Sequence, residues 1–136
     1  MRFAHTFFYL ALLNPRDAAH ADALALSRAV RGGILTTGFI LTELADGLAR
    51  PPARRTYLEL VAALAADPQT HVVPVSEALF DRGSRLYAER PDQRWSLTDC
   101  ISFVVMEEHG VTEALTGDHH FEQAGFIALL KSGRRS

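Results

Sequence analysis

Three acidic residues and one histidine stand where polar side chains could act on a ligand. His5 follows the first short apolar run, and Glu43 lies within a predicted helix. Asp99 opens a later predicted helix, and Asp118 follows an apolar run near the C-terminus. Carboxylates that are brought together repel one another, and a divalent cation relieves that repulsion; oxygen donors suit Mg²⁺ or Mn²⁺. Such an ion polarises a phosphoryl group and generates hydroxide from bound water.

Each of these residues also has an ordinary structural interpretation. An aspartate at the position of Asp99 can cap a helix and interact with the helix dipole. Glu43 can belong to a solvated helix surface, and Asp118 can serve the geometry of a turn. His5 can be a buried, hydrogen-bonded histidine. Taken one at a time, the residues leave both interpretations open.

The elements that would position these side chains alternate along the chain. Strands are predicted over residues 3–5, 34–37, 71–75, 113–116 and 126–130. Helices are predicted over residues 7–13, 17–31, 38–49, 53–66, 77–89 and 98–109. This alternation favours an α/β fold whose mainly parallel, roughly five-stranded sheet is covered by helices on both faces. Ligands bind beyond the carboxyl ends of such strands, so the four residues are expected to converge there.

Length and composition set the remaining limits. The 136 residues suit one domain, predicted over 1–131, with a C-terminal tail at 132–136. A net charge of −2 gives no broad basic field for coating nucleic acid. The single cysteine, Cys100, is consistent with a reducing cytoplasm. No apolar run is long enough to span a membrane.

Three stretches of the chain resemble the PIN-domain family, and especially the toxin ribonucleases of VapBC toxin–antitoxin modules. They are FAHTFFYLALLNPRDAAHADAL, ILTTGFILTELADGL and WSLTDCISFVVMEEHGVTEALTGDHHFEQAGF. The last stretch is the most specific, because an aspartate opens a helix and an apolar strand then ends in Thr-Gly-Asp. The resemblance implies a three-layer α/β/α fold with one acidic, metal-binding site.

The resemblance also assigns roles to individual residues. Members of the family carry four acidic positions, and Glu43, Asp99 and Asp118 match the last three. Thr6 matches the hydroxyl residue that usually follows the first one. Ser96 and Thr98 flank the third acidic position and are expected to support it through hydrogen bonds. Thr6 is also predicted to cap the first helix and Thr98 to open the helix at 98–109.

His5 stands where the family has its first aspartate. Imidazole can ligate Mn²⁺ but is a poor partner for Mg²⁺. Three explanations of this replacement are open. It inactivates the enzyme, whether it is natural or introduced; it shifts the metal preference; or the chain is a non-catalytic relative. A protonated His5 could instead pair with Asp99 or Asp118 in the place of the ion. Because cooperating catalytic groups are costly to lose, we expect activity to be weakened or lost.

The function implied by the resemblance is that of a Mg²⁺- or Mn²⁺-dependent endoribonuclease. Its partners would be an RNA substrate and a cognate antitoxin, and the chain would form a homodimer. Segment 7–10 and the helix after Pro52 are candidate surfaces for contact with the antitoxin and with the second copy of the chain. The alternative is a non-catalytic module that binds RNA or an antitoxin. A receiver-type signalling domain is a weaker alternative, because no lysine ends a late strand; Lys131 is too close to the C-terminus.

Overall fold

A five-stranded, entirely parallel sheet forms the centre of the computed structural model, which describes residues 1–29 and 32–130. The strand order is β3-β2-β1-β4-β5. The strands are β1 (Arg2–Ala4), β2 (Ile34–Thr37), β3 (Thr70–Val73), β4 (Glu113–Leu115) and β5 (Ile127–Ala128). The predicted α/β fold with a mainly parallel sheet of about five strands is therefore confirmed.

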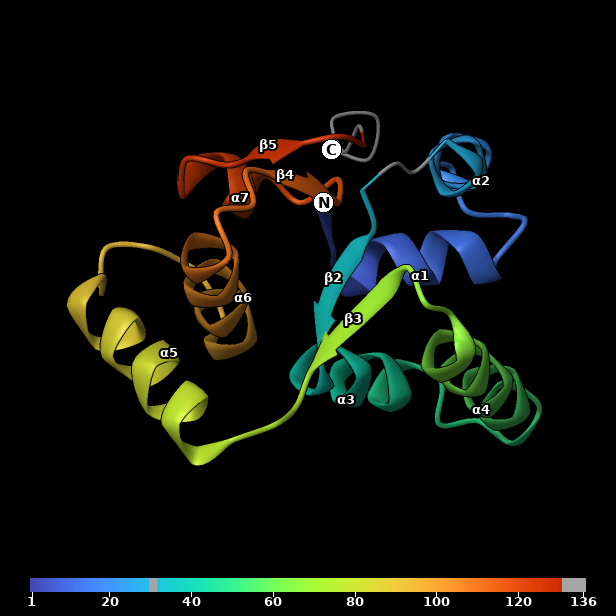
Figure 1. Ribbon diagram of the computed structural model, residues 1–136, viewed down its shortest axis with the longest axis horizontal. Helices are drawn as coiled ribbons and strands as arrows, with labels where there is room; N and C mark the ends of the chain where they lie inside the picture. The colour runs from blue at the N-terminus through green and yellow to red at the C-terminus, as the bar shows by residue number, and fades with distance from the viewer. Residues whose placement is uncertain (30–31, 131–136) are drawn as a thin grey trace.

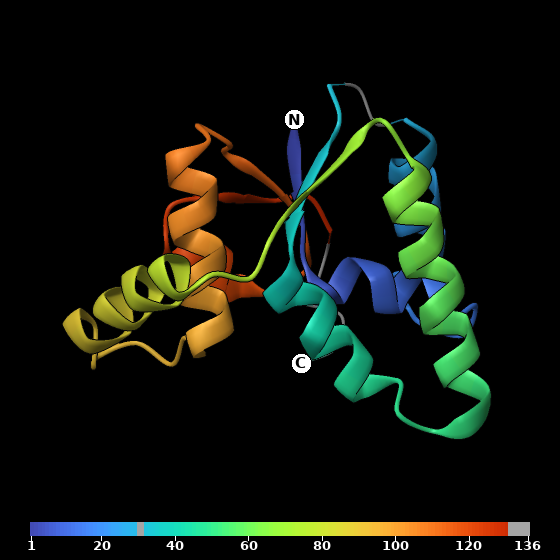
Figure 2. The ribbon, with the colours of Figure 1, turned by 60° about the horizontal axis from the view of Figure 1, so that its bottom comes forward.

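Helices cover both faces of this sheet (Figures 1 and 2). They are α1 (Thr6–Leu13), α2 (His20–Arg28), α3 (Gly38–Gly47), α4 (Pro51–Ala66), α5 (Glu77–Glu89), α6 (Leu97–Glu108) and α7 (His119–Gln123). Figure 2 shows α5 and α6 on one side of the sheet and α1, α2 and α4 on the other. Helix α3 begins directly at the carboxyl end of β2. The sheet edge that was predicted to hold the site is thus surrounded by the starts of helices.

The central strands are short apolar runs because they are buried in the core. Phe3 and Ala4 of β1 have no exposed surface, and neither have Leu35 of β2 and Leu115 of β4. A strand with helices on both faces has to be apolar on both sides. The parallel register pairs Ala4 with Leu115, which brings the residues just after both strands to the same height.

Two helix starts differ from their predictions. Thr6 does not cap the first helix: it is the first residue of α1, His5 holds the N-cap position, and no side chain caps that end. Helix α6 begins at Leu97 with Ser96 as its N-cap, so Thr98 does not open it. Both predicted helix starts are therefore off by one residue, which is common at helix ends because the first turn is defined by the backbone.

The other predicted boundaries are corrected by a few residues. The second helix begins at His20, because Asp17 binds the backbone N–H of Ala19 within the preceding turn. The third strand ends before Pro74, and the last strand is shorter than the predicted 126–130. The predicted end of the second helix at 31 and the tail at 132–136 lie outside the described residues. Within the described ranges, no helix has the length and apolar character needed to cross a membrane.

Candidate metal site at the carboxyl edge of the sheet

The four candidate residues lie on four different segments that meet at the carboxyl ends of the strands. His5 follows β1, and Glu43 lies on α3. Asp99 is in the first turn of α6, and Asp118 connects β4 to α7. Residues separated by more than 100 positions along the chain therefore share one site.

The imidazole of His5 occupies the middle of this cluster. Its Nδ1 lies 2.8 Å from the hydroxyl oxygen of Thr116, the residue that follows β4. Its Nε2 faces the acids, 3.7 Å from Oδ1 of Asp99 and 4.0 Å from Oε1 of Glu43. The ring also packs against Phe121 with centroids 4.7 Å apart. Packing and one hydrogen bond thus fix which nitrogen points at the carboxylates.

Burial determines the charge of His5. Removal from water lowers the pKa of His5, and it outweighs the opposing field of Asp99, Glu43 and Asp118, which raises it. The pKa of His5 is therefore below its usual value of about 6.5. The protonated, ion-paired His5 that the sequence left open is disfavoured at neutral pH, and the ring is a neutral imidazole.

Asp99 both caps its helix and faces the site. The hydroxyl of Ser96 accepts a hydrogen bond from the backbone N–H of Asp99 at 3.0 Å, and Asp99 Oδ2 accepts one from the backbone N–H of Ser96 at 3.2 Å. This capping box fixes the carboxylate while its other oxygen, Oδ1, points toward His5. The predicted support from Ser96 is thus present as a hydrogen bond. The backbone carbonyl of Thr98 accepts a hydrogen bond from the hydroxyl of Ser102.

Asp118 has the same double role at the start of α7. Its Oδ1 accepts a hydrogen bond from the backbone N–H of His120 at 2.9 Å, and its own N–H donates to the Thr116 hydroxyl at 3.1 Å. The turn interpretation of Asp118 is therefore correct, and it does not exclude a role in the site. Both interactions hold the carboxylate next to His5.

Glu43 forms the solvent-facing side of the cluster. Its side chain is 38% exposed, against 7% for Asp99. The hydroxyl of Thr6 donates a hydrogen bond to Oε1 of Glu43, so the first turn of α1 orients the carboxylate carried by α3. The sequence predicts Thr6 as a supporting residue of the site, and this hydrogen bond is the contact through which it would act.

Two polar residues of the site were not among the predicted ones. Thr116 forms hydrogen bonds with both His5 and Asp118. Its position could have been inferred from the Thr-Gly-Asp motif together with the pairing of β1 with β4. His120 lies between two acids, with Nδ1 3.3 Å from Asp99 Oδ2 and 3.4 Å from Asp118 Oδ1. No spacing rule pointed to His120, because its contact with Asp99 depends on how α6 and α7 pack.

The donor chemistry of the cluster fits a divalent cation. Ligand atoms of His5, Asp99 and Asp118 lie within 4.8 Å of one another. None of the ion pairs in the described part of the chain joins an arginine to Glu43, Asp99 or Asp118. The described residues thus give these carboxylates no arginine partner, and unneutralised carboxylates are the condition that a bound metal ion relieves.

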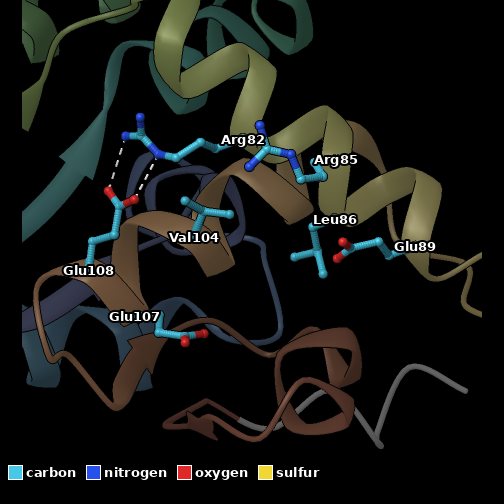
Figure 3. Close-up of a pocket in the computed structure, with 7 residues that line it drawn as sticks. All are labelled: Arg82, Arg85, Leu86, Glu89, Val104, Glu107 and Glu108. Atoms are coloured by element: carbon cyan, nitrogen blue, oxygen red, sulfur yellow. Dashed lines mark hydrogen bonds and ion pairs between the residues drawn. The ribbon is translucent and has the colours of Figure 1, made fainter.

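A second charged region lies between α5 and α6. A cavity of about 480 Å³ lies there, and Figure 3 shows its lining residues, which carry both signs of charge. Arg82 of α5 binds Glu108 of α6 there, with 2.7 Å between Nε and Oε2. The remaining lining residues are Arg85, Leu86, Glu89, Val104 and Glu107. This cavity includes none of the four candidate residues.

The fold and the acidic edge together are those of a PIN domain. The PIN domain family model matches residues 5–127, and the chain belongs to that family. The chain is 28% identical over 129 residues to the 23S rRNA-specific endonuclease VapC20 of Mycobacterium tuberculosis, with 95% of this chain and 98% of the relative covered. These similarities confirm the resemblance to the PIN-domain family and its VapC members.

Solved structures give the same result. The crystal structure of the VapC20 of M. tuberculosis, described as a sarcin-ricin loop cleaving toxin, matches with a TM-score of 0.86 and 27% identity over 96% of this chain and 99% of that one. The VapBC2 structure of Rickettsia felis matches with a TM-score of 0.65 and 12% identity, covering 93% of this chain and 95% of that one. The structure of FitAcB from Neisseria gonorrhoeae matches with a TM-score of 0.65 and 18% identity, covering 94% of this chain and 95% of that one. The last two show a common fold.

Proposed function

We propose that this chain is a metal-dependent endoribonuclease and the toxin component of a toxin–antitoxin pair. The observation that carries the proposal is the convergence of Glu43, Asp99 and Asp118 at the carboxyl edge of a PIN fold. The similarity to an endonuclease over nearly the whole chain supports the same conclusion. By that similarity we also propose ribosomal RNA, and within it the sarcin-ricin loop, as the first substrate to test.

Glu43, Asp99 and Asp118 would hold the divalent ion, Mg²⁺ or Mn²⁺. When bound, such an ion lowers the pKa of a water molecule and stabilises negative charge on the phosphodiester. The contribution of the protein is to fix the ligands beforehand: Thr6 orients Glu43, and the backbone of Ser96 orients Asp99. Without a cation the same carboxylates repel the RNA backbone, so chelation should stop cleavage.

We propose further that His5 weakens the Mg²⁺-supported reaction. The imidazole takes the place of a carboxylate, which removes one negative charge and one oxygen donor from the site. The test compares the purified chain with His5→Asp on ribosomal RNA and on a sarcin-ricin loop oligonucleotide, each in Mg²⁺, Mn²⁺ and EDTA. Asp99→Asn in the His5→Asp background is the negative control.

The expected result is stronger cutting by His5→Asp in Mg²⁺, and none in EDTA or with the control variant. Equal cutting by both chains in Mg²⁺ would show that His5 does not weaken the site. If neither chain cuts either RNA in any metal, the ribonuclease proposal is wrong for these substrates.

A second candidate is a non-catalytic module that binds RNA or an antitoxin. The position of the buried His5 ring favours it, because Nε2 stands between Asp99 and Glu43 where an ion would be shared. This candidate predicts RNA or antitoxin binding with no turnover in Mn²⁺, and measurable turnover in Mn²⁺ would exclude it.

For the protein partners, we propose that α4 contributes to the contact surface. Segment 7–10 is mostly core, because Phe8 and Tyr9 are only 1% exposed. Helix α4, by contrast, has no buried residue, and its Leu58 is 65% exposed. A homodimer is expected by resemblance, and light scattering of the purified chain, compared with a Leu58→Glu variant, tests both the dimer and this surface.

A further inference from the structure

The direction of the His5 ring is that of a metal ligand. Nδ1 is occupied by the Thr116 hydroxyl, so only Nε2 is directed at the acids. The 3.7 Å between Nε2 and Oδ1 of Asp99 is too long for a hydrogen bond. Two donors that each lie about 2.1 Å from one ion are separated by up to about 4.2 Å, so this spacing suits two ligands of a shared cation.

The second nitrogen of the ring is held as metal-bound histidines usually hold theirs. A histidine that ligates a metal through one nitrogen commonly donates the other N–H to an oxygen. Thr116 Oγ1 is such an oxygen at 2.8 Å, and it also receives the N–H of Asp118. One threonine thereby orients two neighbouring donors, His5 and Asp118, toward the same space.

A second group of nitrogen donors lies beside this space. Ligand atoms of His5, Asp99 and Asp118 form one group within 4.8 Å of each other, and those of Asp118, His119 and His120 form another. The two groups share Asp118. The immediate surroundings are therefore a mixed set of imidazole and carboxylate groups.

We propose that this site selects a transition-metal ion of the Mn²⁺, Co²⁺ and Zn²⁺ class over Mg²⁺, with His5 Nε2, Asp99 and Asp118 as ligands. Imidazole binds such ions well, whereas Mg²⁺ prefers oxygen ligands and keeps its water. The inference rests on the proposed function for the presence of a metal, and it adds the class of ion and the ligand that sets it.

The experiment measures metal binding directly, without RNA. Metal-stripped chain is titrated with Co²⁺ and with Mg²⁺ by calorimetry, and the visible absorption of Co²⁺ is recorded. His5→Asp is the test variant, and His71→Asp makes the same change at an exposed histidine. Circular dichroism confirms that each variant is folded.

We expect the unsubstituted chain to prefer Co²⁺ over Mg²⁺, and His5→Asp to reduce the Co²⁺/Mg²⁺ affinity ratio by about tenfold or more. His71→Asp should leave the ratio unchanged. An equal ratio in the unsubstituted and His5→Asp chains would overturn the proposal. So would a chain that binds neither ion while His5→Asp binds Mg²⁺, because His5 would then block the site.

A second measurement does not depend on how His5→Asp folds. Pulsed electron paramagnetic resonance of bound Mn²⁺ detects a coupled imidazole nitrogen. In a chain carrying His119→Gln and His120→Gln, a persisting nitrogen coupling supports His5 as the ligand, and its absence overturns it. If the metal preference is found but no RNA is cut in Co²⁺ or Mn²⁺, the metal inference holds and the proposed ribonuclease function fails.

Discussion

The carboxyl edge of the sheet and the cavity between α5 and α6 both gather charged side chains, but they balance the charges differently. In the cavity, Arg82 and Glu108 neutralise each other across the two helices, and their side chains are 40% and 43% exposed. At the sheet edge, Asp99 is 7% exposed and faces imidazoles instead of arginine. Charge that is held in place without being neutralised is available to bind a cation. Charge that is already paired is available mainly for packing and solubility.

The support beneath the two regions also differs. A row of aromatic rings runs from Trp95 through Phe103 to Phe121 and ends at His5, with centroid distances of 5.1, 4.9 and 4.7 Å. The cavity between α5 and α6 is lined mainly by long charged side chains instead. The edge of the sheet is thus built on rigid packing, and four predictions test this contrast.

The largest effect is expected for Phe121→Ala. Phe121 is fully buried and packs against the His5 ring, so truncating it to alanine should lower the free energy of unfolding by about 3–5 kcal/mol. Leu86→Ala, at the cavity, should cost about 1 kcal/mol because Leu86 is only partly buried. Urea unfolding of both variants gives the comparison, and equal losses would contradict it.

Asp99→Asn should reduce RNA cleavage by about 100-fold or more in the His5→Asp background, because one of the proposed ligand carboxylates is neutralised. Glu107→Gln, the same change at the cavity, should leave the rate within about twofold, since Glu107 belongs to no proposed ligand set. Initial rates in Mn²⁺ measure both. A comparable loss in Glu107→Gln would mean that the cavity takes part in the reaction.

Two helix caps provide a matched pair. Ser96 caps α6 beside Asp99, and Ser76 caps α5 with an equivalent bond to the N–H of Leu79 at 3.1 Å. Each serine-to-alanine change should cost about 1 kcal/mol of stability. Only Ser96→Ala should also slow cleavage and weaken Mn²⁺ binding, because only that cap positions a proposed ligand, Asp99. Thermal unfolding with parallel rate measurements decides the point, and equal rates in both variants would refute it.

The smallest effect is expected for Arg82→Gln. Both side chains of the pair are about 40% exposed, and exposed ion pairs contribute less than about 1 kcal/mol. Cleavage should be unchanged and the stability loss should shrink further at high salt, because salt screens exposed charges. Unfolding curves at two ionic strengths test this, and a loss well above 1 kcal/mol that is insensitive to salt would show that the pair is structurally important.

The sequence predicted the fold because each strand and helix carries its own local signals. Short apolar runs followed by helical spacing led to a parallel sheet, and the helix predicted over 77–89 has the same bounds as α5. Helix starts were less well predicted: Thr6 is the first residue of its helix, and Ser96, not Thr98, is the cap of α6. At α6 two hydroxyl residues compete, and local patterns do not rank them, because the choice depends on what each side chain meets in space.

The amino-acid sequence by itself determined which side chains the site has available, including the imidazole of His5. It also determined the order of the strands' apolar runs, and with them the edge at which these side chains meet. Only the tertiary structure decided that Thr116 turns the His5 ring, that Thr6 holds Glu43, and that His120 reaches Asp99. The physical reason is that these contacts join residues on separate elements, so their geometry arises when the helices pack around the sheet and not from any local preference.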